Sequence, residues 1–153
     1  MVGTGVGMFS ELIKNVVQRD RVVSAPPETS VEAAAILMAE RKVGAVLVVE
    51  RKRLVGIFTE RDVVFRVVAP GRDPRATRLA EVMTKEPMTV APDDSFGYAM
   101  LVMHENGFRH MPVIENGEPI GVVSARNALD PDLEEFESEA RRRMSFRRRG
   151  ASA

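Results

Sequence analysis

Apolar positions recur along this chain with two different spacings, and the spacing predicts the type of each element. Stripes with apolar residues three or four apart predict helices, and short continuous or alternating apolar runs predict strands. Helices are expected at residues 10–18, about 29–42, 60–68 and 95–106, with a helical turn at 79–83. Strands are expected at residues 22–25, 45–49, 54–59, 87–90, 110–115 and 118–124.

Local chemistry marks where these elements begin and end. Thr29 and Glu32 have the spacing of a capping box, which predicts the start of one helix, and Gly44 ends that helix. Pro70 and Gly71 end the helix at 60–68. The pair Asn116–Gly117 is a strong signal for a tight β-hairpin between the last two strands.

The whole pattern occurs twice, because residues 22–62 (the first copy) are repeated without a gap as residues 87–127 (the second copy). Apolar character agrees at most positions that differ. A repeat of this kind is one supersecondary unit used twice, each burying a face that the other cannot bury alone. The identical pairs are Pro27/Pro92, Ser30/Ser95, Ala34/Ala99, Met38/Met103, Glu40/Glu105, Val48/Val113, Glu50/Glu115, Gly56/Gly121 and Arg61/Arg126.

Each copy therefore has the order β-α-β-β-α, which favours an α/β (α+β layered) fold. We expect the function where the copies meet. The predicted division of the chain is a flexible N-terminus (1–7), a first repeat with its leading helix (8–70), a linker (71–86), a second repeat (87–130) and a charged C-terminal helix and tail (131–153). In the tail, acidic residues precede arginines, and this order suits the dipole of a helix reaching about Arg143.

Composition limits the classes of function. The chain has 22 basic and 22 acidic residues, so its balanced charge argues against binding a polyanion over its whole surface. It contains no cysteine, which excludes disulfides and thiolate metal sites and suits a reducing compartment. The apolar runs are too short for a membrane span and the first residues do not form a secretory signal, so we expect a cytoplasmic protein without a membrane partner.

Two short stretches carry a resemblance to a known family. Gly56–Asp62 (GIFTERD) and Phe108–Ile114 (FRHMPVI) resemble the hallmark segments of cystathionine β-synthase (CBS) domains, which occur in tandem as Bateman modules. The resemblance covers about residues 8–130. It implies that the two units pack sheet against sheet and that the module commonly pairs through its helices, so the apolar helix at 60–68 is a candidate homodimer contact.

The resemblance also implies regulatory binding of adenosine compounds, of the AMP, ATP or NAD type, in clefts between the copies, without a required cofactor. One copy's terminal motif would hold ribose and phosphate, and the other copy would hold adenine. Site one would use Thr59, Asp62, Thr89, Val90, Arg109, His110, Met111 and Pro112. Site two would use Ser24, Ala25, Val43, Gly44, Ala45, Ser124, Arg126 and Asn127.

Site one has the better chemistry for this purpose. Thr59 lies where a strand becomes a helix, so its hydroxyl and the first N–H groups of the helix face a phosphate. Asp62 can accept hydrogen bonds from both ribose hydroxyls, while Arg109 and His110 supply donors for phosphate. Site two has a neutral Asn127 in place of the aspartate, which weakens its ribose contact.

Other interpretations of these residues stay open. Thr59 and Asp62 also have the spacing of a capping box, which needs no ligand. His110 can be a satisfied, half-buried histidine. Arg61 and Arg126 can contact a phosphate, a partner subunit or only solvent. An interaction protein with vestigial nucleotide sites is a second hypothesis, supported by Asn127 and by Gly44 standing where the second copy has Arg109.

Further classes of function have less support in the sequence. The arginines at 141–149 suggest nucleic acid or acidic lipid, although a solvated helix end explains them as well. The segment Gly3–Gly7 does not fit the dinucleotide fingerprint, since no strand precedes it. Two isolated histidines make a metal site improbable, and the sequence offers no nucleophile–base pair, so we do not expect an enzyme.

Overall fold

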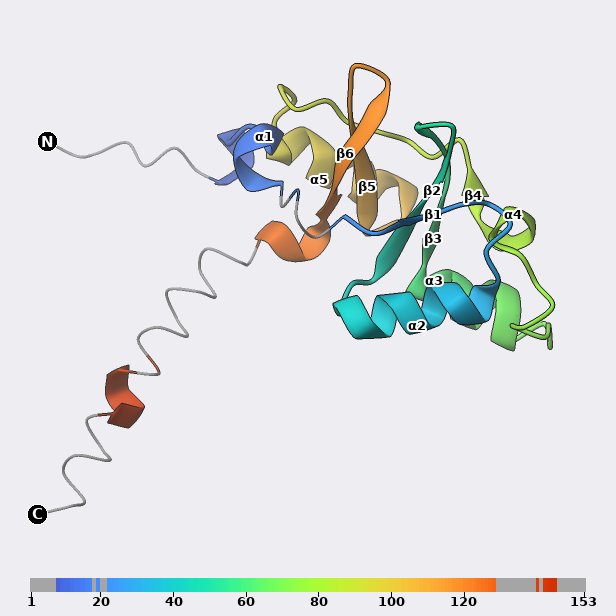
Figure 1. The fold of residues 1–153 in the computed structure, drawn as a ribbon. Coiled ribbons are helices and arrows are strands. Elements are labelled where there is room, and N and C mark those ends of the chain that lie inside the picture. Colours follow the sequence, from blue (N-terminus) through green and yellow to red (C-terminus); the bar gives the residue numbers. More distant parts are fainter. Residues whose placement is uncertain (1–7, 18, 20–21, 129–139, 141, 146–153) are drawn as a thin grey trace, which may run out of the picture.

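The computed structural model describes residues 8–17, 19, 22–128, 140 and 142–145. It confirms the layered α+β architecture built from two similar units (Figure 1). The first unit contains β1 (Ser24–Ala25), α2 (Val31–Arg41), β2 (Ala45–Glu50), β3 (Arg53–Thr59), α3 (Glu60–Asp62) and η3 (Val63–Val68). The second contains α5 (Phe96–Asn106), β5 (His110–Glu115), β6 (Glu118–Ser124) and η4 (Ala125–Ala128). Before and between them lie η1 (Met8–Ser10), α1 (Ile13–Val16), α4 (Leu79–Val82) and β4 (Thr84–Lys85).

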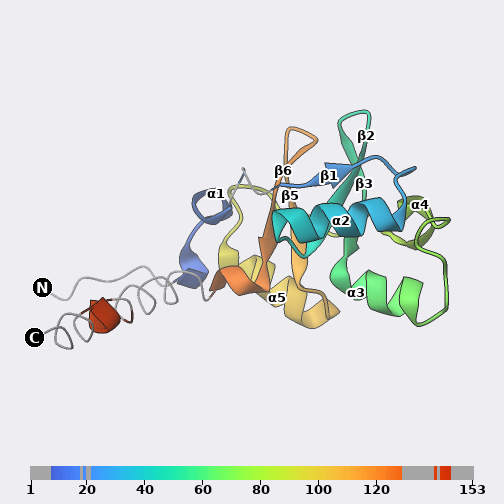
Figure 2. The ribbon, with the colours of Figure 1, turned by 60° about the horizontal axis from the view of Figure 1, so that its bottom comes forward.

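Two sheets form the centre of the molecule, with the hairpins β2–β3 and β5–β6 beside one another (Figures 1 and 2). The first sheet has the order β1-β2-β3-β4, in which β1 is parallel to β2 and the other pairs are antiparallel. The second sheet consists of β5 and β6. The strand predicted at 87–90 is reduced to one parallel bridge between Val90 and Val113. The strand β4 was not predicted, because its partner β3 is distant in sequence.

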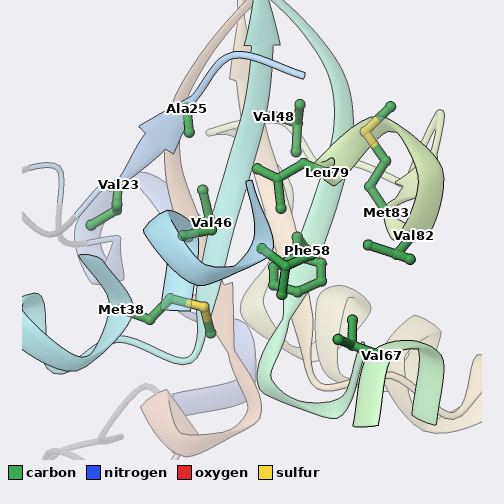
Figure 3. Packing of buried hydrophobic residues seen from close by; sticks show 12 residues of the cluster. Val23, Ala25, Met38, Val46, Val48, Phe58, Val67, Leu79, Val82 and Met83 are labelled. Carbon is green, nitrogen blue, oxygen red and sulfur yellow. The ribbon is translucent and has the colours of Figure 1, made fainter. Parts of the chain in front are cut away.

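Both faces of β2 are buried, which explains its continuous apolar run. Val46 and Val48 face the core of the first unit, together with Phe58 and Leu79 (Figure 3). The alternate residues Ala45 and Leu47 face the other way, since side chains alternate across a strand. They form a separate cluster with Ile57, against which Val122 of β6 packs. This cluster joins the two sheets.

The two long helices begin with the same cap. Ser30 Oγ accepts a hydrogen bond from Ala33 N at 3.1 Å, and Ser95 Oγ accepts one from Tyr98 N at 3.1 Å. The prediction that Thr29 and Glu32 form a capping box is therefore wrong. Glu32 instead pairs with Arg75 across 2.9 Å, a contact that the linker brings to it.

The leading helix is shorter than predicted. Residues 10–18 were expected to be one helix, but the chain forms η1, an extended Leu12, and then the single turn of α1. The extension is explained by pairing with the second unit: Leu12 bridges Ser95, and Ile13 N donates to Asp94 O at 2.9 Å. Ile13 is fully buried in the core of that second unit. Of the apolar residues that predicted this helix, Ile13, Val16 and Val17 pack on the core of the second unit, whereas Phe9 is exposed.

The helix predicted at 60–68 is present as α3 followed by η3, and we call it the 60s helix. Its second part has π geometry, in which Ala69 N donates to Val64 O at 2.9 Å. Val67 is buried beneath it, whereas Val64, Phe65 and Val68 are more than half exposed. An apolar surface is therefore left uncovered on this helix.

The termini lie largely outside the described part of the chain. This includes the N-terminal segment 1–7 and most of the predicted C-terminal helix; residues 140 and 142–145 are helical. Among the helices that the structure describes, none has both the length and the apolar character to cross a membrane.

Candidate functional site

A cavity of about 400 Å³ opens at the junction of the two units. We call it the inter-copy cavity. One wall is the end of β3 with the start of the 60s helix, another is the connection from α5 to β5, and a third is the segment around β4. The lining residues are Ile57, Thr59, Glu60, Arg61, Asp62, Phe65, Thr84, Glu86, Pro87, Met88, Gly107, Phe108, Arg109 and His110. This volume is typical of a small-molecule site.

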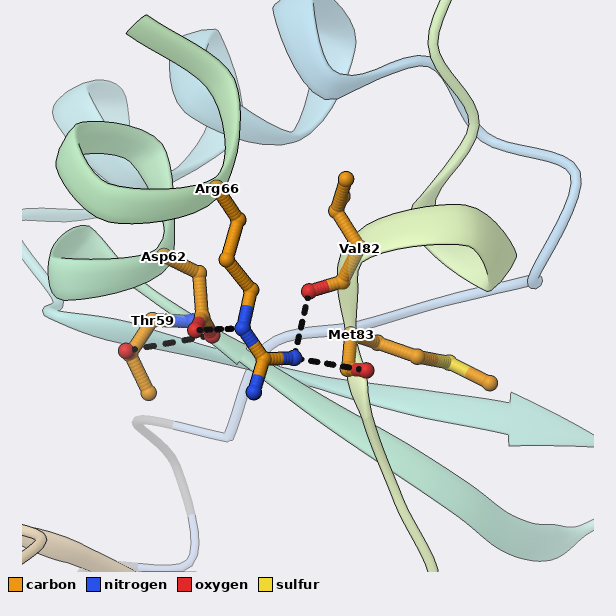
Figure 4. A network of polar contacts seen from close by, with 5 residues as sticks. All are labelled: Thr59, Asp62, Arg66, Val82 and Met83. Atoms are coloured by element: carbon orange, nitrogen blue, oxygen red, sulfur yellow. Dashed lines mark hydrogen bonds and ion pairs between the residues drawn. The ribbon is translucent and has the colours of Figure 1, made fainter. Parts of the chain in front are cut away.

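Thr59 and Asp62 form the cap of the 60s helix on the first wall. Thr59 N donates to Asp62 Oδ2 at 2.9 Å, and Thr59 Oγ1 is 3.3 Å from the same oxygen (Figure 4). The capping interaction left open by the sequence is therefore present. It does not use up the carboxylate, because two carboxylate oxygens have about four acceptor positions between them. The cap holds the carboxylate and the helix N-terminus at the cavity wall.

The second wall carries Arg109 and His110. Arg109 is exposed, and His110 is half-buried at the start of β5. Burial lowers the pKa of His110 below its ordinary value of 6.5, and Arg109 and Arg126 lower it further while Glu60 opposes them. His110 is therefore a neutral imidazole at pH 7, able to donate or accept a hydrogen bond.

Gly44 gives His110 and Glu60 room to approach each other. A Cβ on Gly44 would lie 3.1 Å from His110 Nε2 and 3.2 Å from Glu60 Oε1. Gly44 was predicted to belong to site two, but it contacts two residues that line the inter-copy cavity. Because Gly44 has no side chain, the Glu60 carboxylate and the His110 imidazole can both pack against its backbone.

Arg61 links the two walls directly. Its Nη1 donates to Gly107 O at 2.9 Å, and its guanidinium lies 5.5 Å from the centroid of the Phe65 ring. Arg61 therefore forms a bridge between the copies, which the sequence did not predict. Its contact with a phosphate or a partner subunit stays a prediction.

The third wall was missed by sequence reasoning. Thr84, Glu86, Pro87 and Met88 line the cavity, and the stretch begins with the unpredicted strand β4, so β4 places it there. Pro87 and Met88 belonged to the strand predicted at 87–90. The mixture of polar and apolar residues over 84–88 was the available signal that this stretch lines a site.

The remaining residues predicted for site one lie elsewhere. Thr89 is exposed without lining the cavity, and Val90, Met111 and Pro112 are buried. Val90 and Met111 belong to the core of the second unit, since their side chains point away from the cavity wall into that cluster. Their backbone contact with a ligand stays a prediction.

The described residues predicted for site two do not line the inter-copy cavity, although Ala45 pairs with Thr59 and Ser124 pairs with His110 across their hairpins. Ser24 is exposed, Ala25 and Ala45 are buried, and Val43 is half-buried. Ser124 is half-buried at the end of β6, and Arg126 is exposed on η4. The side chain of Asn127 lies outside the described part. Their common use by a ligand stays a prediction.

Metal binding has no support among the residues that the structure describes: no three histidine, aspartate or glutamate side chains there are grouped to hold an ion.

Comparison with known proteins defines the class. The family model of the CBS domain matches residues 13–69 and 79–132. The chain therefore belongs to the CBS domain family, and its two units form a CBS pair, or Bateman module. CBS pairs of this kind are regulatory modules.

Particular relatives agree with this assignment. Protein MK0525 of Methanopyrus kandleri is 35% identical over 124 residues, which is 80% of this chain and 63% of that protein. The CBS domain-containing protein CBSCBSPB3 of Arabidopsis thaliana is 36% identical over 121 residues, or 78% of this chain and 22% of that protein. The chain thus spans less than two thirds of both relatives.

Solved structures show the same fold. A conserved protein from Pyrococcus horikoshii has a TM-score of 0.75 and 26% identity, covering 81% of this chain and 93% of that one. The CBS domain protein PAE2072 from Pyrobaculum aerophilum, solved in complex with AMP, has a TM-score of 0.70 and 29% identity, covering 76% and 89%. A hexameric CBS-CP12 protein from bloom-forming cyanobacteria has a TM-score of 0.72 and 26% identity, covering 86% of each chain.

Proposed function

We propose that this chain is a non-enzymatic regulatory module that binds an adenosine nucleotide, of the AMP, ATP or NAD type, in the inter-copy cavity and signals its presence to a partner protein. One observation carries the proposal. The cavity places Thr59 and Asp62 of the first copy opposite Arg109 and His110 of the second. A ligand held between these walls would contact both halves of the molecule at once.

The walls of the cavity provide different groups for the ribose, the phosphate and the base of such a ligand. Asp62 accepts hydrogen bonds from ribose hydroxyls, and hydrogen bonds to a charged acceptor contribute about 1.5–3 kcal/mol each. The N-terminus of the 60s helix and the Arg109 guanidinium favour phosphate. Pro87, Met88 and Phe65 supply apolar surface for a base. The AMP complex of the Pyrobaculum relative supports this class of ligand.

Isothermal titration calorimetry with AMP, ATP, NAD and adenosine tests the proposal. We expect saturable binding of at least one nucleotide, weakened about ten- to a hundredfold in Asp62→Asn, which keeps the shape of the side chain and removes its charge. Chromatography after incubation should recover the nucleotide unchanged. No binding of any of the four would contradict the proposal and favour the interaction protein with vestigial sites, for which the uncovered apolar surface is the supporting observation.

We also propose that the module forms a homodimer through its helices. The exposed apolar side chains Ile36, Val64, Phe65, Val68 and Leu101 lie on α2, the 60s helix and α5. Multi-angle light scattering should give twice the mass of the chain, and Val68→Asp should reduce it to the monomer mass while Phe9→Asp does not. A wild-type monomer at working concentration would contradict this.

Nucleic-acid binding remains the least supported hypothesis, because a solvated helix end accounts for the arginines at 141–149 as well. A salt-dependent gel shift that is lost on deleting residues 141–153 would promote it.

A further inference from the structure

We propose that Arg66, which does not line the inter-copy cavity, is the positioning residue that holds two of its walls in place for ribose recognition. This inference rests on the proposed function, because it concerns the same ligand. The residue lies one helical turn after Asp62 on the 60s helix, and its side chain reaches from Asp62 to Val82 and Met83 (Figure 4).

The guanidinium of Arg66 uses separate donors on separate walls. Its Nε lies 3.4 Å from Asp62 Oδ1, on the first wall. Its Nη1 donates to Val82 O and to Met83 O, both at 3.0 Å. These carbonyls end α4 and so have no partner within the helix. The next residue, Thr84, begins β4 and lines the cavity. One rigid fork therefore fixes the carboxylate and the start of the third wall together.

The two oxygens of Asp62 have different partners. Oδ2 accepts from Thr59 in the cap, and Oδ1 pairs with Arg66. Without Arg66, the cap alone would orient the carboxylate through one oxygen and leave rotation about that contact free. The Asp62 side chain is only 13% exposed, so the Arg66 contact is screened less than a surface ion pair. We infer that Arg66 sets the direction in which the free acceptor positions of Asp62 point.

Lysine cannot replace this geometry. Its ammonium is a single point donor, whereas the planar guanidinium spreads its donors over a fixed fork. Arg66→Lys retains the charge beside Asp62 and should keep part of the AMP affinity that Arg66 contributes. Arg66→Gln should keep none of that contribution.

The test compares AMP with 2′,3′-dideoxyadenosine monophosphate, which has the same base and phosphate but lacks the hydroxyls that Asp62 would bind. The dissociation constants of both are measured by calorimetry for the wild type, Arg66→Gln and Arg66→Lys. We expect the AMP affinity to fall about tenfold in Arg66→Gln and the dideoxy affinity to fall about threefold or less. Arg66→Lys should lie between the wild type and Arg66→Gln.

Two controls separate positioning from general destabilisation. Arg72 has a similar exposure, 44% against 47%, and an ion pair with Glu81, but it contacts none of these groups. Arg72→Gln should leave both affinities unchanged. In an Asp62→Asn background, Arg66→Gln should cause no further loss of preference for AMP, since interacting residues are not additive. Where Arg66→Gln does not fold, Arg66→Lys decides the result through the same ratio.

The outcomes are distinct. An equal fall of both affinities in Arg66→Gln and Arg66→Lys, or no fall, overturns the positioning role while the proposed function stands. A wild-type protein that binds none of AMP, ATP, NAD and adenosine instead overturns the proposed function, and this inference with it.

Discussion

Arg61 of the first copy donates a hydrogen bond to the carbonyl oxygen of Gly107 in the second copy, over 2.9 Å. The donor belongs to the first turn of the 60s helix and the acceptor to the C-terminal cap of α5. A cationic side chain at a helix C-terminus also has a favourable interaction with the helix dipole. The contact joins two walls of the inter-copy cavity at residues that both line it.

Removing this bridge should loosen the junction between the copies. Arg61→Met keeps much of the side-chain volume but loses the hydrogen bond and the contact with the Phe65 ring. We expect the free energy of unfolding to fall by about 1 kcal/mol, which is below the ~1.5–3 kcal/mol of a charged hydrogen bond because Arg61 is exposed. Urea denaturation measures the change. Arg53→Met, an exposed arginine at the start of β3, is the control, and an equal loss there would contradict the bridge.

Asp62 and Asn127 should differ as nucleotide contacts. Asp62→Ala should weaken AMP binding by about ten- to a hundredfold, which corresponds to the ~1.5–3 kcal/mol of a charged hydrogen bond. Asn127→Ala should change it much less. The lost cap should also lower the stability of the unliganded Asp62→Ala protein by about 0.5–2 kcal/mol, so binding is measured well below its melting temperature. Equal losses from both variants, or none, would show that the assignment of the sites is wrong.

The charges at the cavity predict opposite effects of two further variants. Arg109→Ala should weaken AMP more than adenosine, because its role is with the phosphate, and added salt should narrow that difference. Glu60→Gln should strengthen AMP relative to adenosine, because it removes a negative charge from the wall that His110 faces. Calorimetry at low and high ionic strength gives both ratios. A shift of the two ratios in the same direction would rule out this division of roles.

His110 should make stability depend on pH in a defined window. Its pKa in the folded protein is lowered mainly by burial, with Arg109 and Arg126 adding to the effect and Glu60 opposing it. Below pH 6.5 the unfolded chain therefore binds the proton more readily than the folded protein does, and the free energy of unfolding falls until the pH drops below the folded pKa. Urea denaturation between pH 7.5 and 5 should show this loss.

His110→Gln should reduce that pH dependence. His104, on the exposed face of α5, provides the comparison, because it is the other histidine in the chain. If the slope persists in His110→Gln, or disappears in His104→Gln instead, the effect does not arise from burial of His110.

Gly121 should not tolerate a side chain, because Val17, which follows α1, packs against it. A Cβ at this position would overlap Cγ2 of Val17. Gly121→Ala should lower the free energy of unfolding by about 1–3 kcal/mol, the range for overpacking a core. The double variant Gly121→Ala/Val17→Ala should be more stable than the sum of the two single changes predicts. Strict additivity in thermal or chemical denaturation would show that the two residues do not compete for this space.

Two kinds of information in the sequence proved reliable. The apolar run at 45–49 and the Asn116–Gly117 turn predicted β2 and the β5–β6 hairpin, because strand pairing and turn type depend on neighbouring residues. The family resemblance named Thr59, Asp62, Arg109 and His110 together, and all four line the inter-copy cavity. Their contact with a ligand stays a prediction.

The sequence by itself therefore determined the repeated unit and most of its strands and helices, and its family resemblance named four of the residues that line the inter-copy cavity. Tertiary structure alone decided that Leu12 pairs with the second unit, that β4 adds to β3, that Arg61 reaches Gly107, and that Arg66 holds Asp62 and the end of α4. The physical reason is one of distance along the chain. Periodicity, caps and turns are set by residues within a few positions. An exposed arginine or a two-residue strand has no local signal for its partner. That partner is fixed only when the packed sheets bring distant backbone groups within hydrogen-bonding distance.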